Sequence, residues 1–240
     1  MLDENKSSHR NRKRCCVIIL GPYRSGTSLI SRMLVELGFY PGEKNELYIA
    51  TDWNPAGYIQ RPDITKFNTE IILNAGGSLE KPPPPSIILK NCTPEKFQHL
   101  NLKWMLKKNK IIVKDPRFCF TLYTWLNQGV LKDFEVKIIR IHRDLKMAAK
   151  SSMQHYDVKH YVGSSLASAT KVLESYNKAA EWHCKNMKLP FLNIGFEELV
   201  LQTNESVLKV SNFLQITDNE IINRACAVVN SGKTRIPNYE

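Results

Sequence analysis

The feature that most constrains the fold is the alternation of short apolar runs with longer segments of helical periodicity. Four mostly apolar runs, rich in β-branched residues, occur at 16–20, 111–113, 136–141 and 191–194. Such runs are typical of strands that are buried on both faces of a sheet. Helical spacing fits the segments 27–38, 62–74, 94–108, 117–127, 144–155, 164–187 and 205–214. Because strands separated by helices form parallel crossovers, this alternation predicts a three-layer α/β domain with a central parallel sheet flanked by helices.

The chain length sets the expected number of domains. With 240 residues, of which 42% are hydrophobic, the chain can build one sizeable core. We therefore predict a single domain over residues 15–240. Residues 1–14 carry an excess of Lys and Arg, which predicts a disordered basic leader, with a basic targeting arm as the alternative. The apolar run that follows is too short to be a membrane span or a signal peptide, so we expect no membrane contact.

Charge and cysteine usage narrow the class of ligand and the compartment. The formal net charge of +11 favours anionic ligands, but it does not distinguish a nucleotide from nucleic acid or a membrane surface. The six cysteines, at positions 15, 16, 92, 119, 184 and 226, show no metal-ligand spacing. We therefore interpret the cysteines as reduced thiols of a cytoplasmic protein without a bound metal, rather than as a disulfide framework.

A glycine loop, GPYRSGTS at 21–28, joins the first predicted strand to the first predicted helix. Its two glycines have the spacing of a nucleotide-binding P-loop, and Ser28 stands at the hydroxyl position of that motif. Thr27, however, replaces the lysine that binds a triphosphate, and Arg24 supplies a cation three residues earlier. Backbone amides at the start of a helix can still bind a phosphate. The loop therefore predicts binding of a terminal 5′-phosphate that carries a leaving group, rather than of a metal-bound triphosphate.

A second motif, VKIIRIHRDLKMAAKSSM at 136–153, predicts a site for a second phosphate. The predicted strand ends at Arg143, and Ser151 follows eight residues later, about two helical turns into the next helix. Both side chains can then face one phosphate, Arg143 with its guanidinium fork and Ser151 with its hydroxyl. Ser152 is the alternative to Ser151.

Together the two motifs resemble those of the sulfotransferases that use 3′-phosphoadenosine 5′-phosphosulfate (PAPS), in particular soluble bacterial members that modify secondary metabolites. The resemblance implies a P-loop-like fold, PAPS as the donor and its desulfated form PAP as the product. It implies that Arg24 contacts the sulfuryl group and the leaving phosphate. The 5′-phosphate would be bound by Ser25, Gly26, Thr27 and Ser28, and the 3′-phosphate by Arg143 and Ser151. Phe196, in the late segment FLNIGFEELV, falls where an aromatic ring can lie against adenine, although a core position is equally compatible.

A third segment, IIVKDPRFCF at 111–120, resembles a K-D-P-R stretch of bacterial sulfotransferases. It follows a predicted parallel strand, where ligands collect in such sheets. Lys114 is the candidate for stabilising the bridging oxygen as the sulfuryl group leaves. Arg117 either orients Asp115 or the acceptor, or it forms a pair with Asp115 that ties down the loop. As in the family, we expect no catalytic metal.

The general base is the role with the poorest match to the family. Pro116 occupies the position where many sulfotransferases have a histidine, and Gln60 stands where related bacterial sequences have a glutamate. Other branches place a glutamate about twenty residues beyond the phosphate loop. On that ground we predict Glu46 as the base, with Glu43 as the second candidate.

The acceptor and the partners are predicted only as classes. The acids Glu43, Glu46 and Asp52 beside the expected site suggest a small-molecule alcohol or amine that could be cationic. A P-loop kinase and a polyanion-binding protein without catalysis are the alternative functions, and no aromatic–basic motif predicts a specific nucleic acid. The apolar face of the helix at 164–187 fits either the core or a homodimer. Lys233 or Arg235 could close over the 3′-phosphate.

Overall fold

The fold is described by a computed structural model, which covers residues 14–52 and 54–232. The predicted leader therefore lies outside the described residues except for Arg14, which begins the first strand. Lys233 and Arg235 also lie outside the described residues.

Within the described residues, four parallel strands form one sheet, as the apolar runs predict. They are β1 (Arg14–Leu20), β2 (Lys110–Lys114), β3 (Phe134–His142) and β4 (Phe191–Gly195), in the order β2-β1-β3-β4. Ile19 of the central strand pairs with Lys114 on one side and with Ile139 on the other. The segments that follow β1, β2 and β3 therefore meet at the carboxyl edge of the sheet, where ligands bind in parallel α/β folds.

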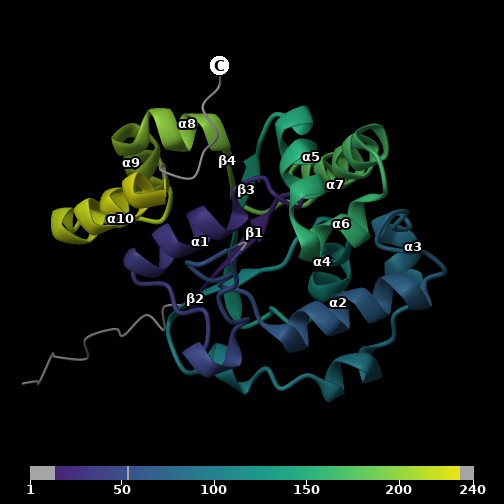
Figure 1. The fold of residues 1–240 in the computed structure, drawn as a ribbon. Helices are drawn as coiled ribbons and strands as arrows, with labels where there is room; N and C mark the ends of the chain where they lie inside the picture. The colour runs from purple at the N-terminus through teal and green to yellow at the C-terminus, as the bar shows by residue number, and fades with distance from the viewer. Residues whose placement is uncertain (1–13, 53, 233–240) are drawn as a thin grey trace, which may run out of the picture.

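Helices cover both faces of this sheet and give the predicted three layers (Figure 1). One face is covered by α1 (Thr27–Glu36), α8 (Phe196–Leu201), α9 (Thr203–Phe213) and α10 (Asn219–Gly232). On the other side lie α2 (Pro62–Asn74), α3 (Pro85–Lys90), α4 (Phe118–Asn127), α5 (Leu145–Gln154), α6 (Tyr156–Val162) and α7 (Leu166–Asn186). Alternate residues of β1 enter the two cores, since Val17 and Ile19 face the first group and Ile18 and Leu20 face the second.

Several connecting helices differ from the prediction. The predicted helix at 94–108 is wrong, because this segment forms two 3-10 helices, Pro94–His99 and Lys103–Leu106, with extended backbone at Leu100 between them. The apolar spacing that suggested one helix instead buries Phe97, Trp104 and Met105 from the two short turns. Helix α3 begins within the proline run at 81–86, which the sequence predicted to be an extended connection. The sequence patterns also did not predict α6, α8 and α10.

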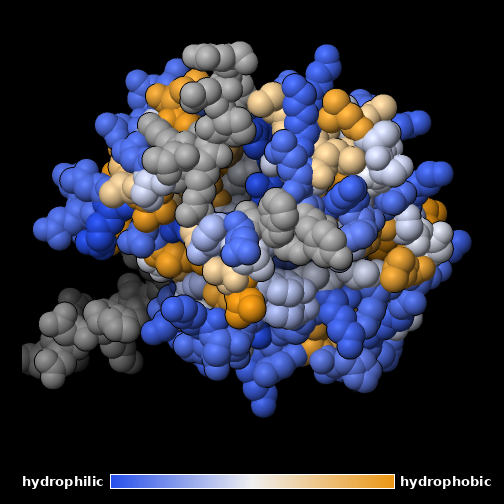
Figure 2. Space-filling view, viewed as in Figure 1, coloured by the Kyte–Doolittle hydropathy of each residue, from blue (hydrophilic) through white to orange (hydrophobic). Residues whose placement is uncertain are grey.

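The surface carries scattered apolar residues. On the face seen in Figure 1, hydrophobic residues form separate spots on a mostly hydrophilic surface (Figure 2). No helix in residues 14–52 and 54–232 has both the length and the apolar character needed to cross a membrane. All six cysteines lie in these ranges, and all are free thiols.

Candidate active site

The loop between β1 and α1 has a backbone that only a few residue types tolerate. Arg24 has a φ of 61° and Gly26 a φ of 95°, both in the left-handed region. A side chain is uncommon there, and such strain clusters at functional sites. Gly21 passes so close to β3 that an added Cβ would lie 2.6 Å from the Ile141 carbonyl oxygen. A Cβ on Gly26 would collide with the ring of Phe196. The predicted phosphate loop is therefore a tight turn packed against β3 and α8.

The N-terminus of α1 is open for a ligand. Gly26 is its N-cap residue, and no side chain there accepts a hydrogen bond from the first turn. Within the described residues, the amides of residues 26–29 donate to no backbone carbonyl. Uncapped amides at a helix start carry partial positive charge and are a ready site for an anion. Ser25 and Thr27 are buried beside these amides, and the Ser28 hydroxyl accepts a hydrogen bond from Asn54 at 3.4 Å.

Helix α5 brings the second motif to this loop. The Nε of Arg24 donates a hydrogen bond to the Ser151 hydroxyl at 3.0 Å, across 127 residues of sequence. Ser152 instead turns into its own helix and donates to the Ala148 carbonyl at 2.8 Å. Of the two serines considered, the structure therefore places Ser151 at the loop.

Arg143, just after β3, also contacts Arg24. Its Nη1 donates to the Arg24 carbonyl at 3.3 Å, and its guanidinium carbon lies 4.4 Å from the centre of the Phe196 ring. Its Nε lies 3.8 Å from a carboxylate oxygen of Glu197 but is buried without a hydrogen-bond partner among the described residues. Burial, and then repulsion from Arg143, lowers the pKa of Arg24. A buried donor and two adjacent guanidinium groups favour an anion between them.

Phe196 begins α8 and is buried beneath the loop, where Gly26 and the Arg143 guanidinium both contact its ring. These contacts show that the ring supports the loop and Arg143. Stacking of this ring on adenine stays a prediction.

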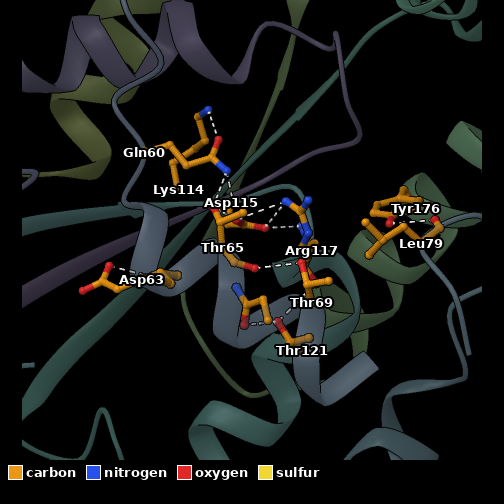
Figure 3. Close-up of polar contacts among 12 residues, drawn as sticks. Gln60, Asp63, Thr65, Thr69, Leu79, Lys114, Asp115, Arg117, Thr121 and Tyr176 are labelled. Carbon is orange, nitrogen blue, oxygen red and sulfur yellow. Dashed lines mark hydrogen bonds and ion pairs between the residues drawn. The ribbon is translucent and has the colours of Figure 1, made fainter. Parts of the chain in front are cut away.

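A buried hydrogen-bond network surrounds Lys114 at the end of β2 (Figure 3). The Lys114 amine donates to Gln60 Oε1 at 2.7 Å, and Gln60 Nε2 donates to a carboxylate oxygen of Asp115 at 2.9 Å. Thr65 donates to the same oxygen at 2.6 Å. Arg117 holds Asp115 through its backbone amide, at 2.7 Å, and through its guanidinium, at 3.4 Å. Of the two interpretations of Asp115 and Arg117, the observed contacts support a pair that ties down the loop.

The environment of Lys114 disfavours its charge. Only 5% of this residue is exposed. Burial, together with repulsion from Arg117, Arg24 and Arg32, lowers the pKa of Lys114 to about 7, although Asp115 opposes the shift. An amine with such a pKa can change its protonation state near neutral pH.

The two predicted bases already have partners. Glu46 accepts a hydrogen bond from Arg61 at 2.7 Å, and Glu43 accepts one from the Tyr40 hydroxyl at 2.6 Å and pairs with Lys107 at 3.4 Å. These contacts lower the pKa of both carboxylates. Sequence reasoning predicted these two glutamates as candidate bases and did not foresee their partners, which are up to 64 residues away.

Aromatic side chains gather beside this network, a feature that sequence reasoning missed. Tyr58 contacts the rings of both Tyr48 and His155 with centroids 6.3 and 6.4 Å away, and Tyr161 lies 5.5 Å from the Arg117 guanidinium carbon. Burial raises the pKa of Tyr48, although a hydrogen bond with Thr65 and the charge of Arg117 oppose the shift. The sequence signal was the two tyrosines within residues 47–60. Their partners are distant in sequence, since His155 lies between α5 and α6 and Arg117 follows β2, so local patterns could not predict the cluster.

The sequence profile described as the sulfotransferase domain matches residues 16–235. That range includes the loop, Lys114, Arg143 and the segment after β4. The chain belongs to the sulfotransferase family.

Solved sulfotransferases share the fold. The sulfotransferase domain from the curacin biosynthetic pathway is 16% identical with a TM-score of 0.55, and the alignment covers 88% of this chain and 77% of that one. The sulfotransferase domain from the Synechococcus PCC 7002 olefin synthase is 17% identical with a TM-score of 0.50, covering 89% and 77%. Mouse sulfotransferase SULT7A1, solved with PAP, is 15% identical with a TM-score of 0.51, covering 95% and 68%. No curated protein matches the sequence. The P-loop-like architecture is therefore confirmed.

The donor set of the site suits phosphate groups. It combines an uncapped helix start, two guanidinium groups, one of them with an orphaned buried Nε, and a serine hydroxyl. In the described ranges, no group of three or more His, Cys, Asp or Glu side chains is arranged to hold a metal ion.

Proposed function

We propose that this sulfotransferase uses PAPS and transfers its sulfuryl group to a hydroxyl or amine of a small molecule, releasing PAP. One observation carries the proposal: Arg24, Ser151 and Arg143 converge from three separate segments on the uncapped start of α1. A donor with two separate phosphates needs two such anion sites, whereas the lysine that would bind a nucleoside triphosphate is replaced by Thr27.

The residues divide between the two ends of the donor. Ser25, Gly26, Thr27 and Ser28 would bind the 5′-phosphate through amides and hydroxyls. Arg143 and Ser151 would bind the 3′-phosphate, and Phe196 would lie against the adenine. When bound, PAPS supplies the sulfuryl group as a sulfate joined to a phosphate. Arg24 and Lys114 would neutralise the charge that develops on that phosphate, a preorganised term worth about 3–4 kcal/mol per group.

Glu46, with Glu43 second, is the proposed base that takes the acceptor proton. Each carboxylate is paired with a cation, Glu46 with Arg61 and Glu43 with Lys107, and the hydrogen bonds that it accepts lower its pKa and weaken it as a base. If Glu46 is the base, Glu46→Gln lowers kcat by about 10²-fold or more without weakening PAP binding. An unchanged kcat would move the base role elsewhere, and Glu43→Gln tests the second candidate in the same assay.

The acceptor is proposed to bind near Tyr48, Tyr58 and His155, beside the Lys114 network. The cationic-acceptor hypothesis rests on Glu43, Glu46 and Asp52. Because two of these acids are already paired, a neutral acceptor with an aromatic or apolar body suits the tyrosines better. The free cysteines support a reducing compartment such as the cytoplasm.

Transfer from ³⁵S-labelled PAPS to a panel of phenols, alcohols and amines tests the proposal, beside transfer from γ-labelled ATP with Mg²⁺. We expect labelled product only from PAPS, and its loss in Arg143→Ala but not in Arg224→Ala. Arg224 is the matched control, because it is more than half exposed and lies 3.9 Å from Glu36 on the surface. Labelled product only from ATP would identify a kinase instead, and tight binding of random duplex DNA without transfer would identify a polyanion-binding protein.

A further inference from the structure

Gln60 stands between the buried amine of Lys114 and the buried carboxylate of Asp115. Its Oε1 accepts from Lys114 at 2.7 Å, while its Nε2 donates to Asp115 at 2.9 Å and to Thr65 at 2.7 Å. Gln60 itself is 9% exposed. The side chain therefore bridges the two charged groups and keeps them from direct contact.

The orientation of this amide follows from its partners. A carboxylate can only accept, so the NH₂ group must face Asp115 and the carbonyl oxygen must face Lys114. The preceding residue, Ile59, has a φ of 47°, which is an outlier for a β-branched side chain. This strained backbone turns Gln60 inward, and the Gln60 carbonyl also accepts a hydrogen bond from the Tyr48 amide at 2.9 Å.

The carboxylate of Asp115 is committed elsewhere. One oxygen accepts from the backbone amide and guanidinium of Arg117, and the other from Gln60, Thr65 and the same guanidinium. Within the described residues, Gln60 Oε1 is the hydrogen-bond acceptor for the Lys114 amine. The amine thus meets a neutral oxygen where a glutamate would offer a full negative charge.

The other charged groups around Lys114 are mostly cations. Arg24 comes from the phosphate loop, Arg32 from α1 and Arg117 from the start of α4, and each lowers the pKa of Lys114. Arg61, before α2, lines a cavity of about 10 Å³ with Lys114 and Gln60, but Glu46 and Asp63 pair with it. This surplus of positive charge disfavours the protonated form of the Lys114 amine, and it favours an anion next to it.

We infer that Gln60 is a positioning residue, whose neutral side chain aims the Lys114 amine and leaves it free to take up a proton from solvent when the phosphosulfate end of the donor binds. The inference rests on the proposed use of PAPS. Protonation on binding completes the positive charge of the amine beside the leaving phosphate. A glutamate at this position would hold Lys114 as a permanent ammonium and neutralise it in an ion pair.

Calorimetry of PAP binding at pH 7.5, in HEPES and in Tris, measures the protons taken up. The phosphates of PAP titrate as well, so the relevant quantity is the difference from Lys114→Arg, which keeps the cation but cannot change its charge. We expect the wild type to take up at least about half a proton more than Lys114→Arg, as a pKa near 7 requires. In Gln60→Glu that excess should fall close to zero, because Lys114 is then charged before PAP binds.

Equal proton uptake in the wild type and Lys114→Arg would overturn the inference while leaving the proposed function intact. An excess that persists in Gln60→Glu would show that Gln60 does not set the charge of Lys114. If PAP binds to none of the folded proteins, the proposed function fails instead.

Thermal unfolding confirms that each variant is folded, and Gln60→Met supplies a second, uncharged replacement. In Gln60→Met the excess should persist while kcat falls at least about tenfold, because the amine is no longer aimed, and an unchanged kcat would contradict positioning.

Discussion

At the residue scale, the site depends on charged side chains held out of water. Arg24, Lys114 and Arg143 are all largely buried at the carboxyl edge of the sheet, and the described residues supply them with few anionic partners. The resemblance at the level of motifs identified all three. The resemblance could not identify Gln60, because the role of this residue depends on its hydrogen bonds with Lys114 and Asp115, about 55 residues away. From the sequence, Gln60 was only a missing carboxylate.

Lys114→Met tests whether the buried amine costs stability. In the unfolded chain the pKa of Lys114 is near its ordinary 10.5, so between pH 7 and 10.5 the unfolded state binds more protons than the folded state. The contribution of Lys114 to the free energy of unfolding of the wild type therefore rises with pH across that window. We expect the pH-dependent part of this cost to favour Lys114→Met by about 4 kcal/mol at pH 7, with the gap closing towards pH 10. Urea unfolding at both pH values measures it, and a constant gap would contradict a lowered pKa.

Ser151 and Ser152 form a matched pair for the second phosphate site. Ser151→Ala removes a hydroxyl that faces Arg24, whereas Ser152→Ala removes one that bonds to its own helix. We expect Ser151→Ala to weaken PAP binding about fivefold and Ser152→Ala to leave it unchanged. Fluorescence or calorimetric titration would settle the comparison. An equal effect of both substitutions would place the 3′-phosphate elsewhere.

At the scale of elements, the strands were predictable and several helices were not. Buried parallel strands such as β1 must be continuously apolar, so their sequences are distinctive. The segment 94–108 has helical spacing, yet packing of Phe97 and Trp104 is satisfied by two 3-10 turns. Whether such a segment forms one helix or two short 3-10 turns depends on its tertiary contacts, which local spacing does not reveal. The start of α1 could be predicted because the glycine loop ends the first strand and helical spacing begins at Thr27.

Gly26→Ala tests the tight packing of α1 against Phe196. Gly38 has a similar φ of 89° but nothing within 4 Å of an added Cβ, so Gly38→Ala measures the backbone strain alone. We expect Gly38→Ala to cost about 1 kcal/mol of unfolding free energy and Gly26→Ala to cost clearly more. Only Gly26→Ala should also abolish PAP binding. Equal losses of stability in the two variants would show that Phe196 can move aside.

At the scale of the whole molecule, two cores on either side of one sheet fix the edge at which three distant segments meet. The single sheet and its three-layer arrangement followed from the alternation of strands and helices. The contacts of Tyr58 with His155 and of Arg61 with Glu46 did not follow from this alternation. They depend on how the loops cross the carboxyl edge of the sheet, which local sequence patterns do not determine.

His183 makes the stability of the whole fold sensitive to acid. It is fully buried in α7, and burial lowers its pKa to about 4. Between the unfolded pKa of 6.5 and this value, the unfolded state binds the extra proton, so stability falls as the pH falls from 6.5 towards 4. Between pH 7 and pH 5 the wild type should lose about 2 kcal/mol more than His183→Gln. Parallel pH dependences of the two unfolding midpoints would contradict this account.

The most direct test of the central claim is calorimetric titration of the wild type, Arg143→Ala and Arg224→Ala with PAP, beside ATP without and with Mg²⁺. We predict metal-independent binding of PAP to the wild type and Arg224→Ala, weakened at least about 30-fold in Arg143→Ala because a buried cation of the site is lost. Binding of Mg²⁺–ATP in place of PAP, or PAP binding that is indifferent to Arg143, would contradict the proposed donor site.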